Sequence, residues 1–262
     1  CAEEANRRLS RLPGEVKLRA TRTPNTATGV VLRALLSPAF TPIDDARLFT
    51  QLAETFGSAL DPYRFTRVDL TDSTELFVAV HVEARKVGDD ELHPGWALRN
   101  SEVGASALTV DDSWLRLVCM NGLLMSVGGK RALYRTHRKV DDDALTADLA
   151  VAMKNLPARW TAAISIMEHA RLTPVPHPDT AVATVLEAAT IPRALVTEAQ
   201  TTALKDGDFT RYGVVQAITY VAHAKNNDPE LRFMMERAAG DYLAATEVPA
   251  NTNAIVPLRA VS

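Results

Sequence analysis

The residues that could do chemistry are concentrated between Arg99 and Lys139. An asparagine-bearing turn at 100–104 (NSEVG) and an Asn-Gly pair at 121–122 flank two strand-like runs, and no acidic residue occurs from Ser113 to Val140. A surface of one charge sign can hold a polyanion, and Lys and Arg contacts to phosphates dominate sequence-independent affinity. The pattern therefore indicates binding of a nucleic-acid backbone. The five cations that we call the basic strip are Lys130, Arg131, Arg135, Arg138 and Lys139.

A second acid-free segment, 16–43, adds Arg19 and Arg33. We predict that the basic strip lines one solvent-facing groove with Arg33 or Arg19, and that the backbone of a single strand runs along it. The alternative is that the strip is only a solvated face. Two strips on one sheet would form a channel, and Tyr134, Trp96 and Trp114 are aromatic residues of the kind that stack on bases. For each tryptophan the alternative is a place in the core.

The turn at 100–104 is the second candidate contact. Asn and Ser side chains bond to nearby backbone groups and favour turns. One interpretation is a structural turn in which Asn100 satisfies buried backbone groups. The functional interpretation has Arg99, Asn100 and Ser101 beside phosphate or sugar.

No catalytic motif in the sequence is complete. The Gly128-Gly129-Lys130 run lacks the Ser or Thr that must follow the Lys of a phosphate-binding loop. The segment 104–108 lacks the closing Gly of a nucleophile elbow. The six histidines are dispersed, without the spacing of a metal site. Acidic residues at 141–143 suit a helix N-terminus better than a magnesium site. We predict no enzyme, no cofactor and no metal.

Composition sets the broad class. The 262 residues include 47% hydrophobic and 23% charged residues, as in an ordinary globular protein, and a net charge of -3 hides a slightly basic first half and an acidic second half. Two cysteines, Cys1 and Cys119, cannot form a disulfide framework, so a reducing cytoplasm is expected. No apolar run approaches the roughly 20 residues of a membrane span. We expect no membrane partner.

The hydrophobic period changes near residue 140, from 2 to 3.6 residues. We predict an α+β fold with a small mixed or antiparallel sheet and helices in residues 1–140, and an all-helical region in residues 141–262. A helix should begin at Asp44 or Asp45 and end at Gly57, and Asn121-Gly122 should form a hairpin turn. The expected strands are 16–22, 29–36, 64–70, 75–84, 96–100, 105–110 and 114–120. The strands 64–70 and 75–84 should pair around a turn at 71–73.

Further signals concern the helical region. Pro157 should end or kink the first of its helices, because proline removes a helical hydrogen bond. Asp228 should cap the last helix, with Pro229 at the first helical position. The segment 212–245 carries more apolar residues than one neighbouring helix need cover, which predicts a homo-oligomer.

The order Arg99-Asn-Ser-Glu-Val-Gly, a short strand, Arg116-Leu-Val-Cys-Met-Asn-Gly and a basic stretch with His137 resembles a known family. It is the phage- and plasmid-associated family catalogued as domain of unknown function 932. The resemblance covers roughly residues 30 to 245, with Met120 as a mild departure. It implies a context of phages and mobile elements more than a chemistry, and the likeness to phage single-strand annealing proteins is an analogy.

These observations lead to three hypotheses. The first is a non-enzymatic protein that binds or anneals single-stranded DNA as an oligomer in the host cytoplasm. The second is a phage or plasmid accessory or assembly protein that binds a protein partner, with no nucleic-acid role. The third is a metal-dependent nuclease whose motif escapes detection. The sequence does not distinguish DNA from RNA.

Overall fold

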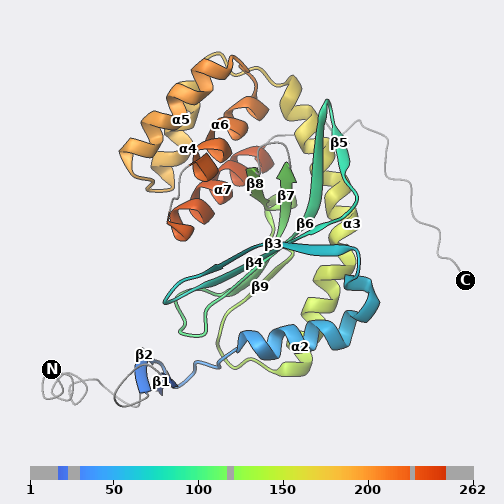
Figure 1. The fold of residues 1–262 in the computed structure, drawn as a ribbon, viewed down its shortest axis with the longest axis vertical. Coiled ribbons are helices and arrows are strands. Elements are labelled where there is room, and N and C mark those ends of the chain that lie inside the picture. Colours follow the sequence, from blue (N-terminus) through green and yellow to red (C-terminus); the bar gives the residue numbers. More distant parts are fainter. Residues whose placement is uncertain (1–16, 23–29, 117–120, 225–227, 246–262) are drawn as a thin grey trace, which may run out of the picture.

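The computed structural model describes residues 17–22, 30–116, 121–224 and 228–245 (Figure 1). The fold is mixed α+β with an antiparallel sheet. The strands are β1 (Lys17–Arg22), β2 (Val30–Leu36), β3 (Tyr63–Leu70), β4 (Glu75–His81), β5 (Arg85–Val87), β6 (Asp90–Asn100), β7 (Leu108–Arg116), β8 (Asn121–Met125) and β9 (Leu133–Arg135). The helices are α2 (Asp45–Phe56), α3 (Asp142–Leu172), α4 (Pro178–Ala188), α5 (Arg193–Asp206), α6 (Arg211–Ala224) and α7 (Pro229–Ala244), with short 3-10 turns η1 (Gly57–Leu60) and η2 (Val127–Gly129).

The main sheet has the strand order β3-β4-β6-β7-β8, and β5 and β9 add short pairings to β6 and β7. Every pairing is antiparallel, and β1 and β2 form a separate hairpin. Strand β3 is therefore an outer strand, since among the described residues it pairs only with β4.

Helices cover both faces of this sheet (Figure 1). Neighbouring residues of a strand point to opposite faces. On β7, Asp112 meets Arg159 of α3, whereas Asp111 meets Arg237 of α7. Helices α2 and α3 thus lie on one face, which we call the α3 face, and α7 lies on the other, the α7 face. Helices α4 and α5 pack behind α6 and α7.

The two predicted parts of the chain share one core. Trp114 of β7 and Leu98 of β6 belong to the same buried cluster as Leu145 and Leu156 of α3. All described strands precede Asp142, so the element order follows the change in hydrophobic period.

Several local predictions are confirmed. Helix α2 ends at Phe56, and Gly57 takes a positive φ of 44°, which glycine tolerates best. Strands β3 and β4 pair around the turn at 71–74. The Asp228 side chain accepts hydrogen bonds from the backbone N–H groups of Glu230 and Leu231, so it caps α7.

The predicted hairpin is present, because β7 and β8 pair antiparallel, but Asn121-Gly122 is not its turn. Asn121 and Gly122 lie inside β8 and pair with Arg116 and Leu115 of β7. A Cβ atom on Gly122 would lie 2.9 Å from the Glu236 carboxylate, so the glycine allows close approach to α7. Cys119, which precedes this strand, and Cys1 lie outside the described residues.

Two strand and helix boundaries also differ from expectation. Strand β7 runs unbroken through Asp111-Asp112, where two separate strands were predicted, because arginines from both faces neutralise these aspartates. Helix α3 continues through Pro157, so the proline does not end it, and a kink at this position stays a prediction. Burial of Leu156 and Trp160 on either side of the proline stabilises the helix enough to offset the lost hydrogen bond.

The apolar residues that predicted an oligomer through α6 and α7 are mostly covered by their own chain. Val214, Val215, Ile218 and Met235 are fully buried. These residues therefore give no reason to expect an oligomer, because packing within the chain already removes them from water.

Candidate nucleic-acid interface and buried charge networks

The basic strip is divided in space. Lys130, Arg138 and Lys139 are exposed, and within the described part of the chain no carboxylate lies within ion-pair distance of them. The other two cations are partly offset: Arg135 Nη1 lies 2.9 Å from Asp148 Oδ2 of α3, and Arg131 Nε lies 3.6 Å from Asp111 Oδ1. Although the segment of sequence around these cations has no acid, Asp111 and Asp148 lie beside them in the fold.

An open groove lies beside β9. It has a volume of about 380 Å³ and takes in Tyr134, Arg138, the turn at 104–107 and part of β2. Tyr134 is 63% exposed, whereas Trp96 and Trp114 are buried in the core. We call this feature the Tyr134 groove. The remaining cations of the basic strip, and Arg19 and Arg33, are not among its lining residues, so the predicted single groove is not formed as one cavity.

The floor of the Tyr134 groove contains polar atoms without partners. His137 is 6% exposed, and its ring stacks on Phe40 with 5.2 Å between ring centroids. Both ring nitrogens of His137, and the Oγ of Ser106, are buried and have no hydrogen-bond partner among the described residues. Burial lowers the pKa of His137, so its ring is neutral at pH 7.

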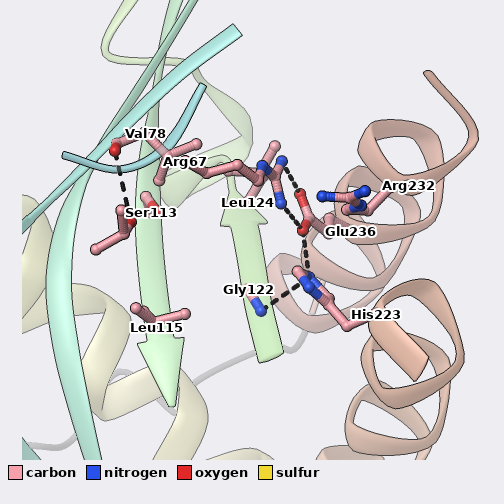
Figure 2. Close-up of a pocket in the computed structure, with 10 residues that line it drawn as sticks. Arg67, Val78, Ser113, Leu115, Gly122, Leu124, His223, Arg232 and Glu236 are labelled. Carbon is pink, nitrogen blue, oxygen red and sulfur yellow. Dashed lines mark hydrogen bonds and ion pairs between the residues drawn. The ribbon is translucent and has the colours of Figure 1, made fainter. Parts of the chain in front are cut away.

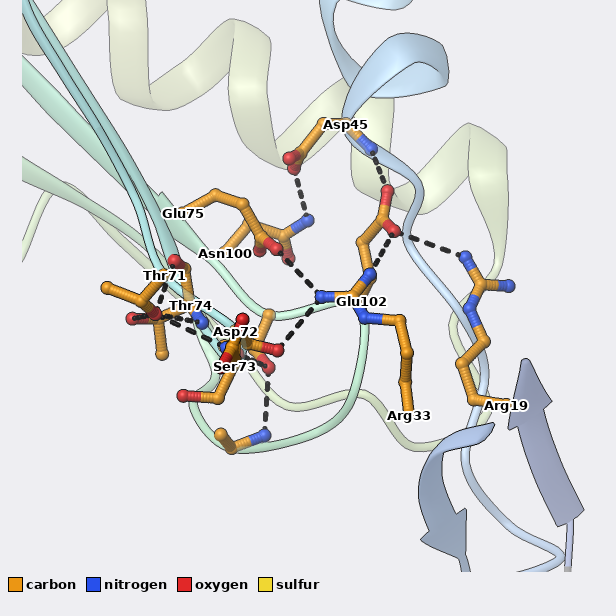
Figure 3. A network of polar contacts seen from close by, with 12 residues as sticks. Arg19, Arg33, Asp45, Thr71, Asp72, Ser73, Thr74, Glu75, Asn100 and Glu102 are labelled. Carbon is orange, nitrogen blue, oxygen red and sulfur yellow. Dashed lines mark hydrogen bonds and ion pairs between the residues drawn. The ribbon is translucent and has the colours of Figure 1, made fainter. Parts of the chain in front are cut away.

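The turn at 100–104 is a structural junction (Figure 3). Asn100 is fully buried, and its Nδ2 donates to Ile43 O at 2.8 Å and to Asp45 Oδ1 at 2.7 Å. These bonds hold the start of α2 against β6. Asn100 cannot reach a phosphate from this position, so that contact is corrected to the structural alternative. Ser101, also buried, donates to Ser73 O and accepts from the Ala105 backbone N–H.

Glu102 of the same turn binds the two cations predicted from the second acid-free segment. Arg33 Nη1 lies 3.3 Å from Glu102 Oε2, and Arg19 Nη2 lies 3.4 Å from the same oxygen (Figure 3). Arg19 also pairs with Asp44. Both arginines therefore fasten the β1–β2 hairpin to the turn at 100–104.

Carboxylates crowd this junction. Burial raises the pKa of Glu75, and the negative charges of Asp45 and Glu102 raise it further. Burial likewise raises the pKa of Asp45, although the hydrogen bond from Asn100 opposes this. Glu75 is paired directly opposite Asn100 in the β4–β6 register. Glu75 Oε2 and Asn100 Oδ1 are both buried oxygens without a hydrogen-bond partner among the described residues.

Arg99, the remaining predicted contact, faces α7. Its Nη2 lies 2.6 Å from Glu230 Oε2, and its guanidinium carbon lies 4.1 Å from the ring centroid of Phe233. Ion pairing and a cation–π contact with one helix place Arg99 between the sheet and α7.

A partly enclosed pocket of about 210 Å³ lies between the sheet and α6–α7 (Figure 2). Arg67 of β3 binds the fully buried Glu236 carboxylate with both terminal nitrogens, one of them at 2.8 Å. His223 Nε2 is 2.6 Å from Glu236 Oε1 and 3.0 Å from the Gly122 backbone nitrogen. Burial alone would raise the pKa of Glu236, but Arg67 and His223 lower it to about 2.

Whether His223 Nε2 carries a proton determines which of these two hydrogen bonds it forms. A protonated Nε2 donates to Glu236, and a deprotonated Nε2 accepts the Gly122 amide hydrogen. The two contacts cannot both be hydrogen bonds at the same time.

The acidic partners in these networks were not predicted from the sequence. Asp111 and Asp112 were a detectable signal, because two adjacent aspartates beside an apolar run invite pairing with arginine. Glu236 had no such signal, since it stands 169 residues from Arg67.

The comparisons with known proteins give no relative. No protein-family profile matches the chain, and neither a curated protein nor a solved structure is similar to it. In the described residues, no group of three or more His, Cys, Asp or Glu side chains is placed to hold a metal ion. The described helices include none that is long and apolar enough to cross a membrane.

Proposed function

We propose that the chain is a non-enzymatic protein that binds single-stranded DNA in the Tyr134 groove and anneals complementary strands. The observation that carries this proposal is an exposed tyrosine in an open groove, beside exposed cations. Sequence-tolerant single-strand binding combines these parts, because aromatic rings stack on bases and cations follow the backbone.

Each part of the groove has a role in this proposal. Tyr134 stacks on a base, and Arg138 contacts the adjoining phosphate. Lys139 is exposed next to Arg138 in the chain and contacts the following phosphate from outside the lining. Arg131 and Arg135 contribute less than the sequence suggested, because Asp111 and Asp148 already offset their charges. Lys130 lies outside the lining of the groove and extends the phosphate path.

The proposal also includes a biological context. A role in DNA recombination of a phage or mobile element, in the host cytoplasm, rests on the resemblance of the segments around 99–104 and 116–122 to a phage- and plasmid-associated family. Annealing by an oligomer rests on analogy with phage annealing proteins.

The test is fluorescence anisotropy with labelled oligothymidylate over a series of salt concentrations. Replacing both Arg138 and Lys139 by Ala should weaken binding and reduce the salt slope by about 0.7 per lost contact. Tyr134→Ala should weaken binding by about 1–3 kcal/mol with an unchanged salt slope, because it removes stacking and no charge. The matched control replaces Arg193 and Lys205 on α5 by Ala, which removes the same charge from another surface.

Equal losses in the groove variants and the control would overturn the proposed site. Failure of the parent to bind single strands at low salt would overturn the function. Annealing is measured separately, as the rate at which two complementary labelled strands pair, and Tyr134→Ala should slow it.

One observation favours the alternative of a protein partner. A wide, mostly apolar groove of about 560 Å³ lies between α4 and α7, lined by Val185, Ala188, Phe233, Met234 and Tyr242. Substituting Met234 by Lys should leave DNA binding unchanged. If the parent fails to bind DNA, this groove becomes the leading candidate for function.

A further inference from the structure

Strand β3 leaves one edge of the main sheet open. Within the described residues it pairs with β4 alone. Its apolar side chains are unusually exposed for a strand beside a core: Phe65 is 57%, Val68 51% and Leu70 66% exposed. An open edge of eight residues with exposed apolar side chains can add a further strand.

A β-bulge determines which β3 side chains share a face. The pairing with β4 shifts between Phe65 and Arg67, so Thr66 is the extra residue. Phe65 contacts Trp96 on the α3 face, and Val68 pairs with Phe77, whose ring packs on Phe49 of α2.

Two other β3 side chains, Arg67 and Asp69, point to the α7 face. Arg67 binds Glu236 of α7, and Asp69 lies 3.7 Å from Arg232 of the same helix. Without the bulge, Phe65 and Val68, three positions apart, would point to opposite faces.

We propose that two copies of the chain pair through β3, antiparallel, in the register that places Phe65 of one copy opposite Val68 of the other. This inference is independent of the proposed DNA binding. The same register places Tyr63 opposite Leu70 and Arg64 opposite Asp69, and Thr66 opposite Arg67 beside the two-fold axis.

The register is self-complementary. Antiparallel pairing of one segment with itself is a two-fold interface, in which each contact occurs twice. The pairs Phe65–Val68 and Tyr63–Leu70 then lie on the α3 face. Arg64 of one copy and Asp69 of the other form opposite-charge pairs on the α7 face. Cross-strand pairs of these kinds stabilise antiparallel sheets.

The charges around the axis are compatible with this pairing. Arg64 is exposed and donates to the backbone oxygens of Asp61 and Tyr63, so its guanidinium is free of carboxylates in the described chain. Arg67, which comes closest to the axis, is neutralised within its own chain by Glu236 and Asp69. The dimer would join the two main sheets into one continuous sheet.

An interface of one strand pair is small. Stable interfaces bury about 1,200–2,000 Å² in total, and weak ones bury less. We expect a reversible dimer with a dissociation constant in the micromolar range.

Sedimentation velocity over a concentration series tests the proposal. The parent should pass from monomer to dimer as concentration rises, and Arg64→Glu should raise the dissociation constant at least about tenfold because it faces Asp69 with a like charge. The matched control is Arg193→Glu, the same change at an exposed site on α5. A parent that stays monomeric, or equal dissociation constants for the two variants, would overturn the proposal.

Cross-linking tests the register itself. In a background with Cys1 and Cys119 replaced by Ser, the double variant Phe65→Cys with Val68→Cys should form a covalent dimer under mild oxidation. Directly opposed strand residues have Cβ atoms about 4.5–5.5 Å apart, close to disulfide geometry. The control pair Val151→Cys with Leu172→Cys, on α3, is more exposed than the tested pair and so at least as accessible to oxidation. Equal cross-linking by both pairs would contradict the register.

Discussion

Two buried glutamates on opposite faces of the sheet respond to burial in opposite ways. On the α7 face, Glu236 has a pKa lowered to about 2. On the α3 face, Glu75 of β4 has a raised pKa. Both lose hydration, which by itself raises a carboxyl pKa. Glu236 is surrounded by Arg67 and His223, whereas Glu75 lies beside two further carboxylates and only one arginine, at 3.7 Å.

The difference shows that neighbours, more than burial, decide what a buried acid does to stability. A lowered pKa means that folding favours the charged form, and the charge stabilises the folded state. A raised pKa means that the charge opposes folding. The α7 face therefore uses a buried charge to fasten a helix, and the α3 face tolerates charges that destabilise the junction at 100–104.

The largest expected effect is on Glu236. Glu236→Gln should lower the free energy of unfolding at neutral pH by about 3 kcal/mol, because it leaves Arg67 buried without its counter-charge. Since the folded pKa of about 2 lies below the ordinary 4.5, this contribution is present above pH 4.5 and is lost as pH falls toward 2. Urea unfolding at several pH values measures it.

The control for this prediction is Glu187→Gln, at an exposed position on α4. It should change stability by no more than about 0.5 kcal/mol. If Glu236→Gln costs less than about 1 kcal/mol at neutral pH, the contrast between the two faces is wrong.

Glu75 should respond in the other direction. Glu75→Gln should raise the free energy of unfolding at alkaline pH by about 1 kcal/mol, because it removes a charge that burial and two carboxylates disfavour. Its amide could also donate to the unpaired Asn100 Oδ1. Because the folded pKa is raised, the gain should shrink as pH falls through that pKa and the parent Glu75 becomes protonated.

Glu91→Gln on β6 serves as the exposed comparison for Glu75. Thermal unfolding at alkaline and mildly acidic pH distinguishes the two. A loss of stability in Glu75→Gln at alkaline pH would mean that the pairing with Arg33 outweighs repulsion.

The smallest effect is expected at His137, in the Tyr134 groove. Its pKa is lowered below 6.5 by burial, so the unfolded chain binds a proton that the folded chain excludes. The parent should therefore lose stability as pH falls below 6.5, and His137→Gln should lose less, by up to about 1 kcal/mol. The exposed His177→Gln provides the control in the same urea titrations. Identical pH profiles for the parent and His137→Gln would refute the lowered pKa.

Local sequence signals predicted elements whose causes are local. The helix stop at Gly57, the cap at Asp228 and the hairpin turn at 71–74 depend on residues a few positions apart. Asn121-Gly122 lies in a strand and Pro157 does not end α3, because packing outweighed a local preference at both positions. Gly240 also has a tertiary cause, because α7 approaches β8 so closely that a Cβ at this position would lie 1.8 Å from Leu124 O.

The sequence by itself determined that the strands precede residue 140 and the long helices follow it, and where the cations stand along the chain. Only the tertiary structure decided which cations are free, because an ion pair needs proximity and not sequence spacing. Arg99 meets Glu230 across 131 positions and Arg33 meets Glu102 across 69, whereas Arg138 and Lys139 remain exposed at the surface. Hydrophobic periodicity reports which side of an element is buried, but not which distant element will cover it.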